Sequence, residues 1–296
     1  MRNDFLRGAK HKLAKKKLAV AIPASVISDT PHLREKTSKV GLIGRAAAIF
    51  RVSEIIVYPD NPKIKQSGEV DLIATLLAYM ETPQYLRKRL FKLEPRLQYA
   101  GILPPLRTPH HPLNRKTRNL KVGEYREGAV LSKTREGALV DIGVERPALM
   151  REKQSAAGKR LTVRIAKVGE EVEVQTADRD EIPDYWGYTV TVEKHSLKKL
   201  IENRKFDLTI ATSRKGAKFT EIAEELAGKW KTAASVLIGF GAPTRGLYEI
   251  ARDEGTNLND LVDFVVNTIP AQGTETVRTE EALLASLAIL NVQFGF

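Results

Sequence analysis

The 296-residue sequence contains no cysteine. This absence excludes disulfide frameworks, thiolate metal sites, cysteine nucleophiles and CxxC redox motifs. Long apolar runs are also missing, since no stretch approaches the ~20 residues that a membrane-spanning helix needs. The N-terminal residues MRNDFLRGAKHKLAKKK lack the apolar core of a secretory signal. We therefore expect a cytoplasmic protein that is neither exported nor inserted in a membrane.

Several catalytic motifs are absent as well. The sequence contains no P-loop, no HExxH and no GxSxG, and the glycines at 239 and 241 do not begin a GxGxxG fingerprint. These absences disfavour NAD-dependent dehydrogenases, P-loop ATPases, zincins and α/β hydrolases. His110 and His111 are adjacent in a proline-rich segment, where a loop cap or a phosphate contact is favoured over a metal. We expect no metal site.

Positive charge is in excess and unevenly placed. The chain has 48 Lys and Arg against 36 Asp and Glu, a formal net charge of +12. Bases cluster before residue 18 and between residues 87 and 121, whereas acids outnumber bases from Asp207 onward. Segregated bases indicate a nucleic-acid binder, and an exposed basic face without a ligand is the alternative. The candidate contacts are Arg87, Lys88, Arg89, His110, His111, Arg115, Lys116, Arg118, Lys133, Arg135 and Arg160.

Apolar patterning alternates between strand-like and helix-like segments at both ends of the chain. The predicted strands are 18–22, 54–58, 188–192, 208–212, 234–240 and 264–268. The predicted helices are 28–50, 71–80, 197–203, 220–227, 245–254 and 280–290. Such alternation predicts a mostly parallel sheet with helices on both faces.

The middle of the chain breaks this alternation. Short valine-rich runs separated by glycines predict a small β-barrel of five strands. The runs are 125–131, 137–143, 146–150, 160–166 and 170–176. An oligonucleotide-binding (OB) barrel and an inert SH3-like barrel are both compatible with this pattern. We expect the barrel, 113–178, to be an insertion between the two parts of one α/β domain, 1–112 and 179–296.

Glycine-bearing loops follow two of the predicted strands. The segments 236–243 and 265–281 place Gly239, Gly241 and Gly273 beyond the carboxyl ends of strands, where open α/β sheets bind ligands. Glycine lets the backbone approach a ligand closely. Tight turns without a ligand are the alternative interpretation.

Several motifs resemble one known group of enzymes. They are IGRAAAIFRVSEIIVY (43–58), YMETPQYLRKRLF (79–91), AGILPPLRTPHHP (100–112) and VNTIPAQGTETVRTEEALLASLAIL (266–290). Together they resemble the SPOUT methyltransferase superfamily, in the archaeal and eukaryotic branch with an inserted OB-like domain. The resemblance implies a C-terminal trefoil knot, S-adenosyl-L-methionine as cofactor, RNA as substrate, with ribosomal RNA favoured, and a homodimer that completes the active site.

The resemblance also assigns candidate residues. The cofactor-binding set is Thr212, Ser213, Leu237, Gly239, Gly241, Asn267, Thr268, Ile269, Gln272, Gly273 and Thr279. Thr279 suits the N-cap of the last helix, with Glu280 and Glu281 in its first turn. Residues 278–280, RTE, resemble a segment of the branch that methylates N3 of uridine in ribosomal RNA.

Arg45 and Arg278 are the catalytic candidates, because a cation beside uridine O2 or O4 would stabilise the negative charge that develops there. Structural ion pairs explain both arginines equally well. The apolar C-terminal helix predicts a buried homodimer interface. A non-catalytic RNA-binding or ribosome-assembly factor on a SPOUT scaffold is the main alternative, and a structural protein that binds no nucleic acid is the third.

Overall fold

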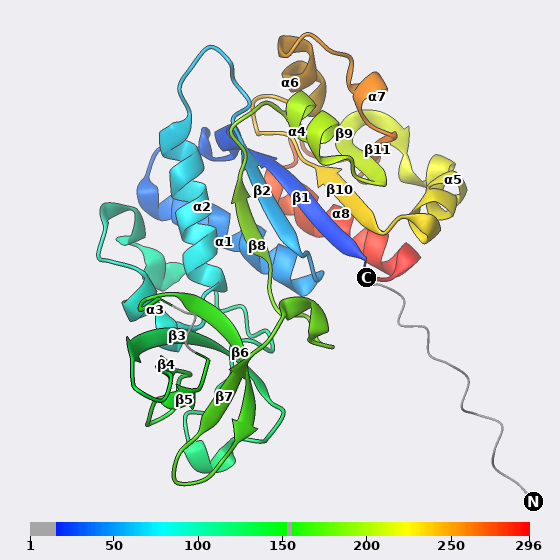
Figure 1. The fold of residues 1–296 in the computed structure, drawn as a ribbon. Helices are drawn as coiled ribbons and strands as arrows, with labels where there is room; N and C mark the ends of the chain where they lie inside the picture. Colours follow the sequence, from blue (N-terminus) through cyan, green and yellow to red (C-terminus); the bar gives the residue numbers. More distant parts are fainter. Residues whose placement is uncertain (1–15, 153–155) are drawn as a thin grey trace, which may run out of the picture.

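The computed structural model describes residues 16–152 and 156–296. The bases at 1–15 that the sequence analysis singles out lie outside the described residues. The described chain forms a six-stranded sheet flanked by helices and a closed five-stranded barrel, which lies beyond one end of the sheet (Figure 1).

The sheet is entirely parallel, in the order β11-β9-β10-β1-β2-β8. Its strands are β1 (Lys17–Pro23), β2 (Glu54–Tyr58), β8 (Thr189–Val192), β9 (Leu208–Lys218), β10 (Ser235–Gly239) and β11 (Phe264–Asn267). All six strands that the sequence predicts are present, and β9 continues beyond its predicted end. The central strand β1 is buried along nearly its whole length, as expected for a parallel sheet covered on both faces.

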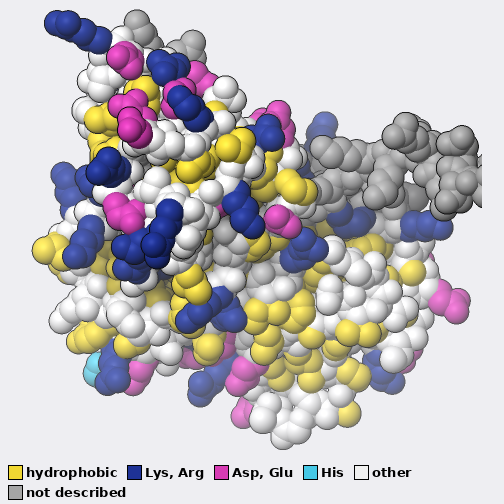
Figure 2. Space-filling model, turned by 90° about the horizontal axis from the view of Figure 1, so that it is seen from below, with side chains coloured by type: hydrophobic (Ala, Val, Ile, Leu, Met, Phe, Trp, Pro, Cys, Tyr) yellow, Lys and Arg dark blue, Asp and Glu magenta, His cyan; other side chains and the backbone are white. Residues whose placement is uncertain are grey.

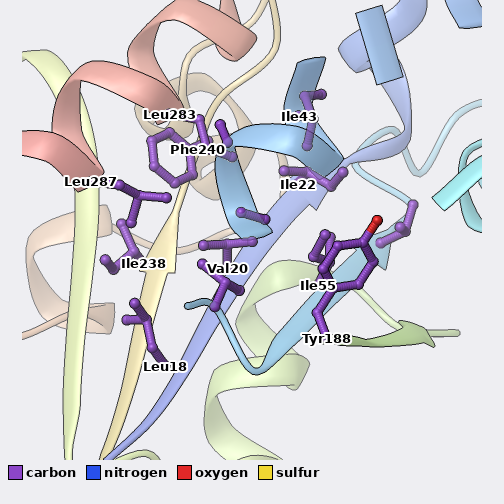
Figure 3. Packing of buried hydrophobic residues seen from close by; sticks show 14 of the residues in the cluster. Leu18, Val20, Ile22, Ile43, Ile55, Tyr188, Ile238, Phe240, Leu283 and Leu287 are labelled. Atoms are coloured by element: carbon purple, nitrogen blue, oxygen red, sulfur yellow. The ribbon is translucent and has the colours of Figure 1, made fainter. Parts of the chain in front are cut away.

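Helices cover both faces of the sheet. One face packs against α1 (Leu33–Ile49), α2 (Ser67–Glu81), α5 (Phe219–Thr232) and α8 (Thr279–Phe294). The other packs against α4 (Leu197–Arg204), α6 (Leu247–Asp253) and α7 (Leu258–Leu261). Each face of the sheet has its own hydrophobic core, and the side chains of β1 point alternately into one and the other. Leu18, Val20 and Ile22 belong to the core under α1, α2, α5 and α8 (Figure 3). Ala19 and Ala21 belong to the core under α4, α6 and α7.

Two short helices were not predicted. They are α3 (Gln84–Leu90), which starts directly after Pro83, and α7. Each helix has one buried side chain, Leu86 in α3 and Leu258 in α7. A single buried residue cannot produce the apolar spacing by which a helix is predicted. The predicted helix at 28–50 begins later, at Leu33: residues 28–32 form a connecting segment that follows the 3₁₀ turn η1 (Ala24–Ile27) and ends in extended backbone at the N-cap His32.

The predicted five-stranded barrel is confirmed. Its strands are β3 (Tyr125–Lys133), β4 (Ala138–Asp141), β5 (Ala148–Met150), β6 (Arg160–Lys167) and β7 (Glu173–Thr176), closed in the order β3-β4-β5-β7-β6. Apolar side chains such as Val130, Val140 and Ile165 form a core separate from the two cores of the sheet. Three further 3₁₀ turns precede the barrel strands in the sequence: η2 (Pro95–Leu97), η3 (Ala100–Ile102) and η4 (Thr117–Asn119). Another, η5 (Arg179–Glu181), follows them.

Buried charges join the barrel to the α/β part, in what we call the domain junction. Glu81, at the end of α2, accepts hydrogen bonds from Arg160 of β6 at 2.6 Å and from Arg179 at 3.1 Å. Arg160 also binds the Glu127 carboxylate of β3 at 2.6 Å, and Trp186 donates to the same carboxylate at 2.6 Å. Glu81 and Glu127 are almost fully buried, at 6% and 2% side-chain exposure.

The C-terminal helix buries more of its apolar surface within the chain than the sequence analysis expected. Leu283, Leu287 and Leu290 belong to the core, and Phe294 stacks on Trp230 at 5.0 Å between ring centroids. The apolar terminus is therefore covered mainly by its own chain. None of the helices in the described ranges is long and apolar enough to cross a membrane.

Candidate functional site

A cavity of about 290 Å³ lies at the carboxyl ends of β9, β10 and β11. Its walls are three loops, at 212–215, 240–246 and 266–277, together with the first turns of α8. Since the carboxyl ends of parallel strands meet at one edge of a sheet, loops distant in sequence converge there. The cavity lies where the glycine-bearing loops predict a ligand.

The first loop is an excursion from β9. The pairing register on β9 jumps between Val265 and Val266 of β11, so that residues 212–216 leave the ladder. Gly216 permits the return, because a Cβ there would lie 2.6 Å from the Val265 carbonyl oxygen. The Thr212 hydroxyl donates to the last carbonyl of β10 at 3.0 Å. The excursion is thereby fixed to both neighbouring strands.

The second loop, 240–246, is a tight turn. The Ala242 N–H donates to the Arg245 carbonyl at 2.9 Å, and the Arg245 N–H donates back to Ala242 at 3.3 Å. Gly241 approaches the other limb of the turn closely, since a Cβ there would lie 3.1 Å from the Gly246 Cα atom. A side chain at position 241 would therefore require the Gly246 side of the turn to shift by a few tenths of an ångström.

Asn267 organises the third loop. Its Nδ2 donates to the Arg214 carbonyl at 3.0 Å, and its Oδ1 accepts from the Ile269 N–H at 3.0 Å. The Arg214 guanidinium in turn donates to the Glu275 carbonyl at 2.8 Å. Ala271 has a φ of 55°, a left-handed conformation that costs a residue with a Cβ about 1 kcal/mol or more. The third loop is thus held against the first in a strained shape.

The start of α8 closes the floor of the cavity. The Thr279 hydroxyl donates to the Gly241 carbonyl at 2.8 Å. The expectation that Thr279 is the N-cap is wrong, because Arg278 occupies that position and its N–H donates to the Glu281 carboxylate at 2.9 Å. The Thr279 hydroxyl is used to fix the second loop to the last helix.

Charged side chains surround the mouth of the cavity. The Lys215 Nζ lies 3.0 Å from a Glu249 carboxylate oxygen, and this hydrogen bond lowers the pKa of Glu249. The Arg245 guanidinium lies 3.5 Å from the buried Asp60 carboxylate and also pairs with Asp253. Charges of both signs are therefore held at fixed positions beside the cavity.

The structure brings most of the predicted cofactor residues together. Those that line the cavity are Thr212, Ser213, Gly241, Asn267, Thr268, Ile269, Gln272 and Thr279. The residues come from the three loops and the first residue of α8, and they span 67 positions of the sequence (212 to 279). Loop residues named from short motifs thus share one site.

Three predicted cofactor residues do not line the cavity, and their role stays a prediction. Leu237 is 1% exposed and packs in the core between the sheet and α6. A Cβ on Gly239 would meet Leu247 at an ordinary contact distance of 3.5 Å, so no close approach demands glycine there. A Cβ on Gly273 would meet no atom within 4 Å. Of the glycines predicted, Gly241 is the one whose backbone is closely approached.

Sequence reasoning missed several lining residues: Arg214, Lys215, Phe240, Arg245, Glu249 and Ser286. Phe240 lies in the predicted loop 236–243, so the glycine signal could have included it, whereas Arg245 was predicted to begin a helix. Glu249 and Ser286 lie inside helices, where only the three-dimensional packing shows which face meets the cavity.

Comparison with known proteins identifies the family. A family described as "Putative RNA methyltransferase" matches residues 17–290, nearly the whole chain. The chain belongs to this RNA methyltransferase family.

Named relatives of this methyltransferase cover most of its length. It is 35% identical to the 28S rRNA (uridine-N(3))-methyltransferase of Mus musculus and 34% identical to that of Homo sapiens. Each match covers 92% of this chain and 75% or 77% of the relative. An uncharacterized protein of Halobacterium salinarum is 33% identical over 93% of this chain and 98% of its own. The chain spans 63% of the length of the Drosophila melanogaster relative.

The two catalytic candidates of the methyltransferase lie in different places. Arg45 donates to the carbonyls of Pro105 and Leu106, so it holds the proline-rich linker, residues 104–112, against α1. Arg45 does not line the cavity. Arg278 is exposed between Val277 and Thr279, both of which line the cavity. No ion pair engages the Arg278 guanidinium among the described residues. Arg278 therefore lies next to the cavity in sequence without lining it, and Arg45 has a structural role within this chain.

The predicted RNA contacts divide into buried and exposed residues. His110 is fully buried, and its Nε2 lies 3.0 Å from the Glu81 carbonyl. Arg160 is held by Glu81 and Glu127 in the domain junction. These two are removed from the RNA-binding set, because neither can reach an external phosphate without breaking the junction.

The remaining candidates stay predictions. His111 is half-buried, Arg87 is fixed in a groove described below, Arg89 pairs with Asp141, and Lys116 pairs with Glu145. Exposed bases are Lys88, Arg115, Arg118, Lys133 and Arg135. In the described ranges, no group of three or more His, Asp or Glu side chains is placed to hold a metal ion.

Proposed function

We propose that this protein is an S-adenosylmethionine-dependent methyltransferase that modifies N3 of a uridine in ribosomal RNA. The observation that carries the proposal is the three-loop cavity, whose lining contains most of the residues expected for the cofactor. The substrate is supported by the names of the mouse and human relatives. The methyltransferase family itself implies a methyl donor.

The lining of the cavity fits this cofactor. Phe240, Val266 and Ile269 offer an apolar wall suited to an adenine ring. Asn267 and Glu249 offer polar groups suited to the ribose hydroxyls and the amino group. At Gly241 the second loop is closely packed, since a Cβ there would lie 3.1 Å from the Gly246 Cα atom. When bound, S-adenosylmethionine supplies an activated methyl group.

The chain's own residues orient the acceptor and meet its charge. Methylation at N3 requires loss of the N3 proton, which spreads negative charge onto O2 and O4 of the uracil ring. Arg278, which is exposed and adjacent in sequence to two lining residues, is our candidate for stabilising that charge. Arg214, Lys215 and Arg245 are cations that line the cavity itself. The loops at 212–215 and 266–277 position the base by enclosing it between them.

We further propose that the three loops form a trefoil knot and that two copies of the chain associate. The hydrogen bond from Thr279 to Gly241, which joins α8 to the loop after β10, supports the first proposal. Exposed apolar side chains on α1 and α8 support the second: Leu42, Ile49, Leu284 and Val292. From below, hydrophobic side chains gather on one side of the molecule, and most Lys and Arg side chains in view lie on the other (Figure 2).

The barrel is proposed to be an OB-like RNA-binding unit spanning residues 113–178. Its separate core supports an independent unit. The closed order β3-β4-β5-β7-β6 and the exposed bases on its surface support the OB assignment.

Mapping of ribosomal RNA modifications by mass spectrometry, with and without the gene, tests the proposed function. We expect one uridine to lose a methyl group at N3 in the deletion strain and to regain it when the gene is restored. An unchanged modification profile, combined with intact RNA binding, would favour a non-catalytic assembly factor.

A further inference from the structure

A second cavity, of about 450 Å³, lies between α2, α3 and the proline-rich linker that leads to the barrel. We call it the junction groove. Four of its lining residues are bases: Arg87, Lys88, Arg107 and Arg115. None of the described residues that line it is Asp or Glu. The groove is therefore positively charged on several sides, with no internal counter-charge.

The bases of the groove differ from their neighbours in their partners. Arg89, next to Lys88, pairs with Asp141 at 2.6 Å, and Lys116, next to Arg115, pairs with Glu145 at 3.3 Å. Within the described ranges, no ion pair engages Lys88, Arg107 or Arg115. Arg89 and Lys116, which do not line the groove, are therefore neutralised, whereas the described bases Lys88, Arg107 and Arg115, which line it, have no carboxylate partner.

Arg87 is held in place without a carboxylate. Its guanidinium lies 4.7 Å from the centre of the Tyr79 ring, and it donates to the carbonyls of Thr82 at 2.9 Å and Met80 at 3.0 Å. All of these partners are neutral, although the side chain is half-buried. A buried cation ordinarily has an anionic partner, because removing a lone charge from water is costly. An external anion would supply the missing counter-charge.

The backbone of the linker adds an independent observation. Arg107 has a φ of 54°, in the left-handed region that residues with a Cβ avoid. Such conformations cost about 1–3 kcal/mol and concentrate at ligand-binding segments. The strained residue is one of the unpaired bases of the groove.

We propose that the junction groove binds the phosphates of a single-stranded segment of the RNA substrate, away from the target nucleotide. This proposal rests on the proposed function, because it names where the same substrate is held. Several bases around one hollow suit a polyanion that can enter it, and the exposed Leu113 beside Arg115 offers an apolar contact to an unpaired base. A duplex is too wide to enter such a hollow.

The groove and the cofactor cavity belong to different ends of the fold. The cavity lies at the carboxyl ends of β9, β10 and β11, whereas α3 borders the barrel (Figure 1). The groove therefore anchors RNA and takes no part in methyl transfer. Losing it should raise KM for RNA and leave kcat nearly unchanged.

The test compares two double charge reversals in the full-length protein. Arg107→Glu with Arg115→Glu alters the groove, and Lys194→Glu with Lys199→Glu makes the same charge change at two exposed lysines around the start of α4, outside the proposed RNA-binding residues. The probe is a labelled, unstructured RNA of about 20 nucleotides, whose binding is measured across a salt series. We expect the groove variant to bind at least about tenfold more weakly, with a flatter salt dependence, and the α4 variant to stay within about threefold of wild type.

Three results would overturn the proposal. Equal losses in both variants would indicate only general attraction, and no loss in the groove variant would show that RNA binds elsewhere. Binding of a polyglutamate peptide to the groove, in preference to the RNA, would assign it to an acidic protein. Calorimetric titration with S-adenosylmethionine separates this from the proposed function: unchanged cofactor binding with lost RNA affinity supports the groove, whatever the methylation assay shows.

Discussion

The cofactor cavity and the domain junction are held together by different kinds of interaction. The cavity is made of backbone loops fixed by short polar contacts, such as that from Thr279 to Gly241. The junction is made of long charged side chains, in which buried Glu81 faces Arg160 and Arg179. The cavity therefore tolerates side-chain changes that spare its backbone shape, whereas the junction depends on each charge being matched. This difference can be tested by substitution.

The largest expected effect is at Glu81. Glu81→Ala would leave Arg160 and Arg179 partly buried with only Glu127 as counter-charge, which should destabilise the protein by about 3–5 kcal/mol. Chemical denaturation measures this, and cofactor affinity should persist in the folded fraction. The matched control is Glu136→Ala, since Glu136 is exposed and lies 3.9 Å from Arg151. A loss below about 1 kcal/mol at both positions would refute the contrast.

The second effect is at Gly241. Gly241→Val would crowd the Gly246 side of the turn and should weaken S-adenosylmethionine binding by about tenfold to a hundredfold, the equivalent of the 1–3 kcal/mol cost of overpacking. Gly239→Ala serves as control, because a Cβ there has ordinary contacts. Calorimetry should show near-normal affinity for the control. If the two variants bind the cofactor equally well, the second loop is not part of its site.

The third effect depends on pH and on His111. Burial, with the nearby His110, lowers the pKa of His111 to about 4, while an unfolded histidine titrates near 6.5. Between pH 4 and pH 6.5, His111 is protonated in the unfolded chain and neutral in the folded chain. Stability is therefore complete above pH 6.5 and falls as the pH drops towards 4, by about 1–2 kcal/mol at pH 5.

The acid sensitivity of His111 can be isolated by substitution. His111→Gln should flatten the fall in melting temperature between pH 7 and pH 5, whereas the exposed His195→Gln should leave it unchanged. Glu81 contributes at lower pH. Burial alone would raise its pKa, but hydrogen bonds from His110 and the charge of Arg160 hold it well below its usual range. An identical pH profile in both histidine variants would count against a neutral, buried His111.

The smallest effect is at Thr279. Thr279→Val keeps the shape of the side chain but removes the hydrogen bond to the Gly241 carbonyl, at a cost of about 1 kcal/mol in stability. Thermal unfolding with and without S-adenosylmethionine would measure it. We expect the stabilisation by cofactor to shrink as well, because the second loop is less well held. A variant as stable as wild type in both states would show that this contact is dispensable.

The sequence predicted the elements of the fold better than their assembly. All six strands of the sheet and the five of the barrel were readable, because each has its own apolar period or glycine boundaries. The ion pairs of the domain junction could not be predicted from the sequence. Arg160 looked like one more exposed base, because its partners Glu81 and Glu127 are 79 and 33 positions away.

The same limit explains the errors at the site. Gly239 and Gly241 are equivalent in sequence, but only the three-dimensional turn shows that Gly241 alone is crowded. The excursion at 212–216 follows a continuous strand pattern and is visible only from its pairing with β11. Resemblance to a family supplied the remaining loop residues, which local chemistry could not have distinguished from ordinary turns.

Transfer of labelled methyl groups to ribosomal RNA tests the central claim most directly. Purified protein would be incubated with labelled S-adenosylmethionine and ribosomal RNA from a strain lacking the gene, and the digested nucleosides would be separated by chromatography and identified by mass spectrometry. The account predicts that the label appears in 3-methyluridine. Label in a ribose-methylated nucleoside, or no label from a protein that binds both the cofactor and RNA, would contradict it.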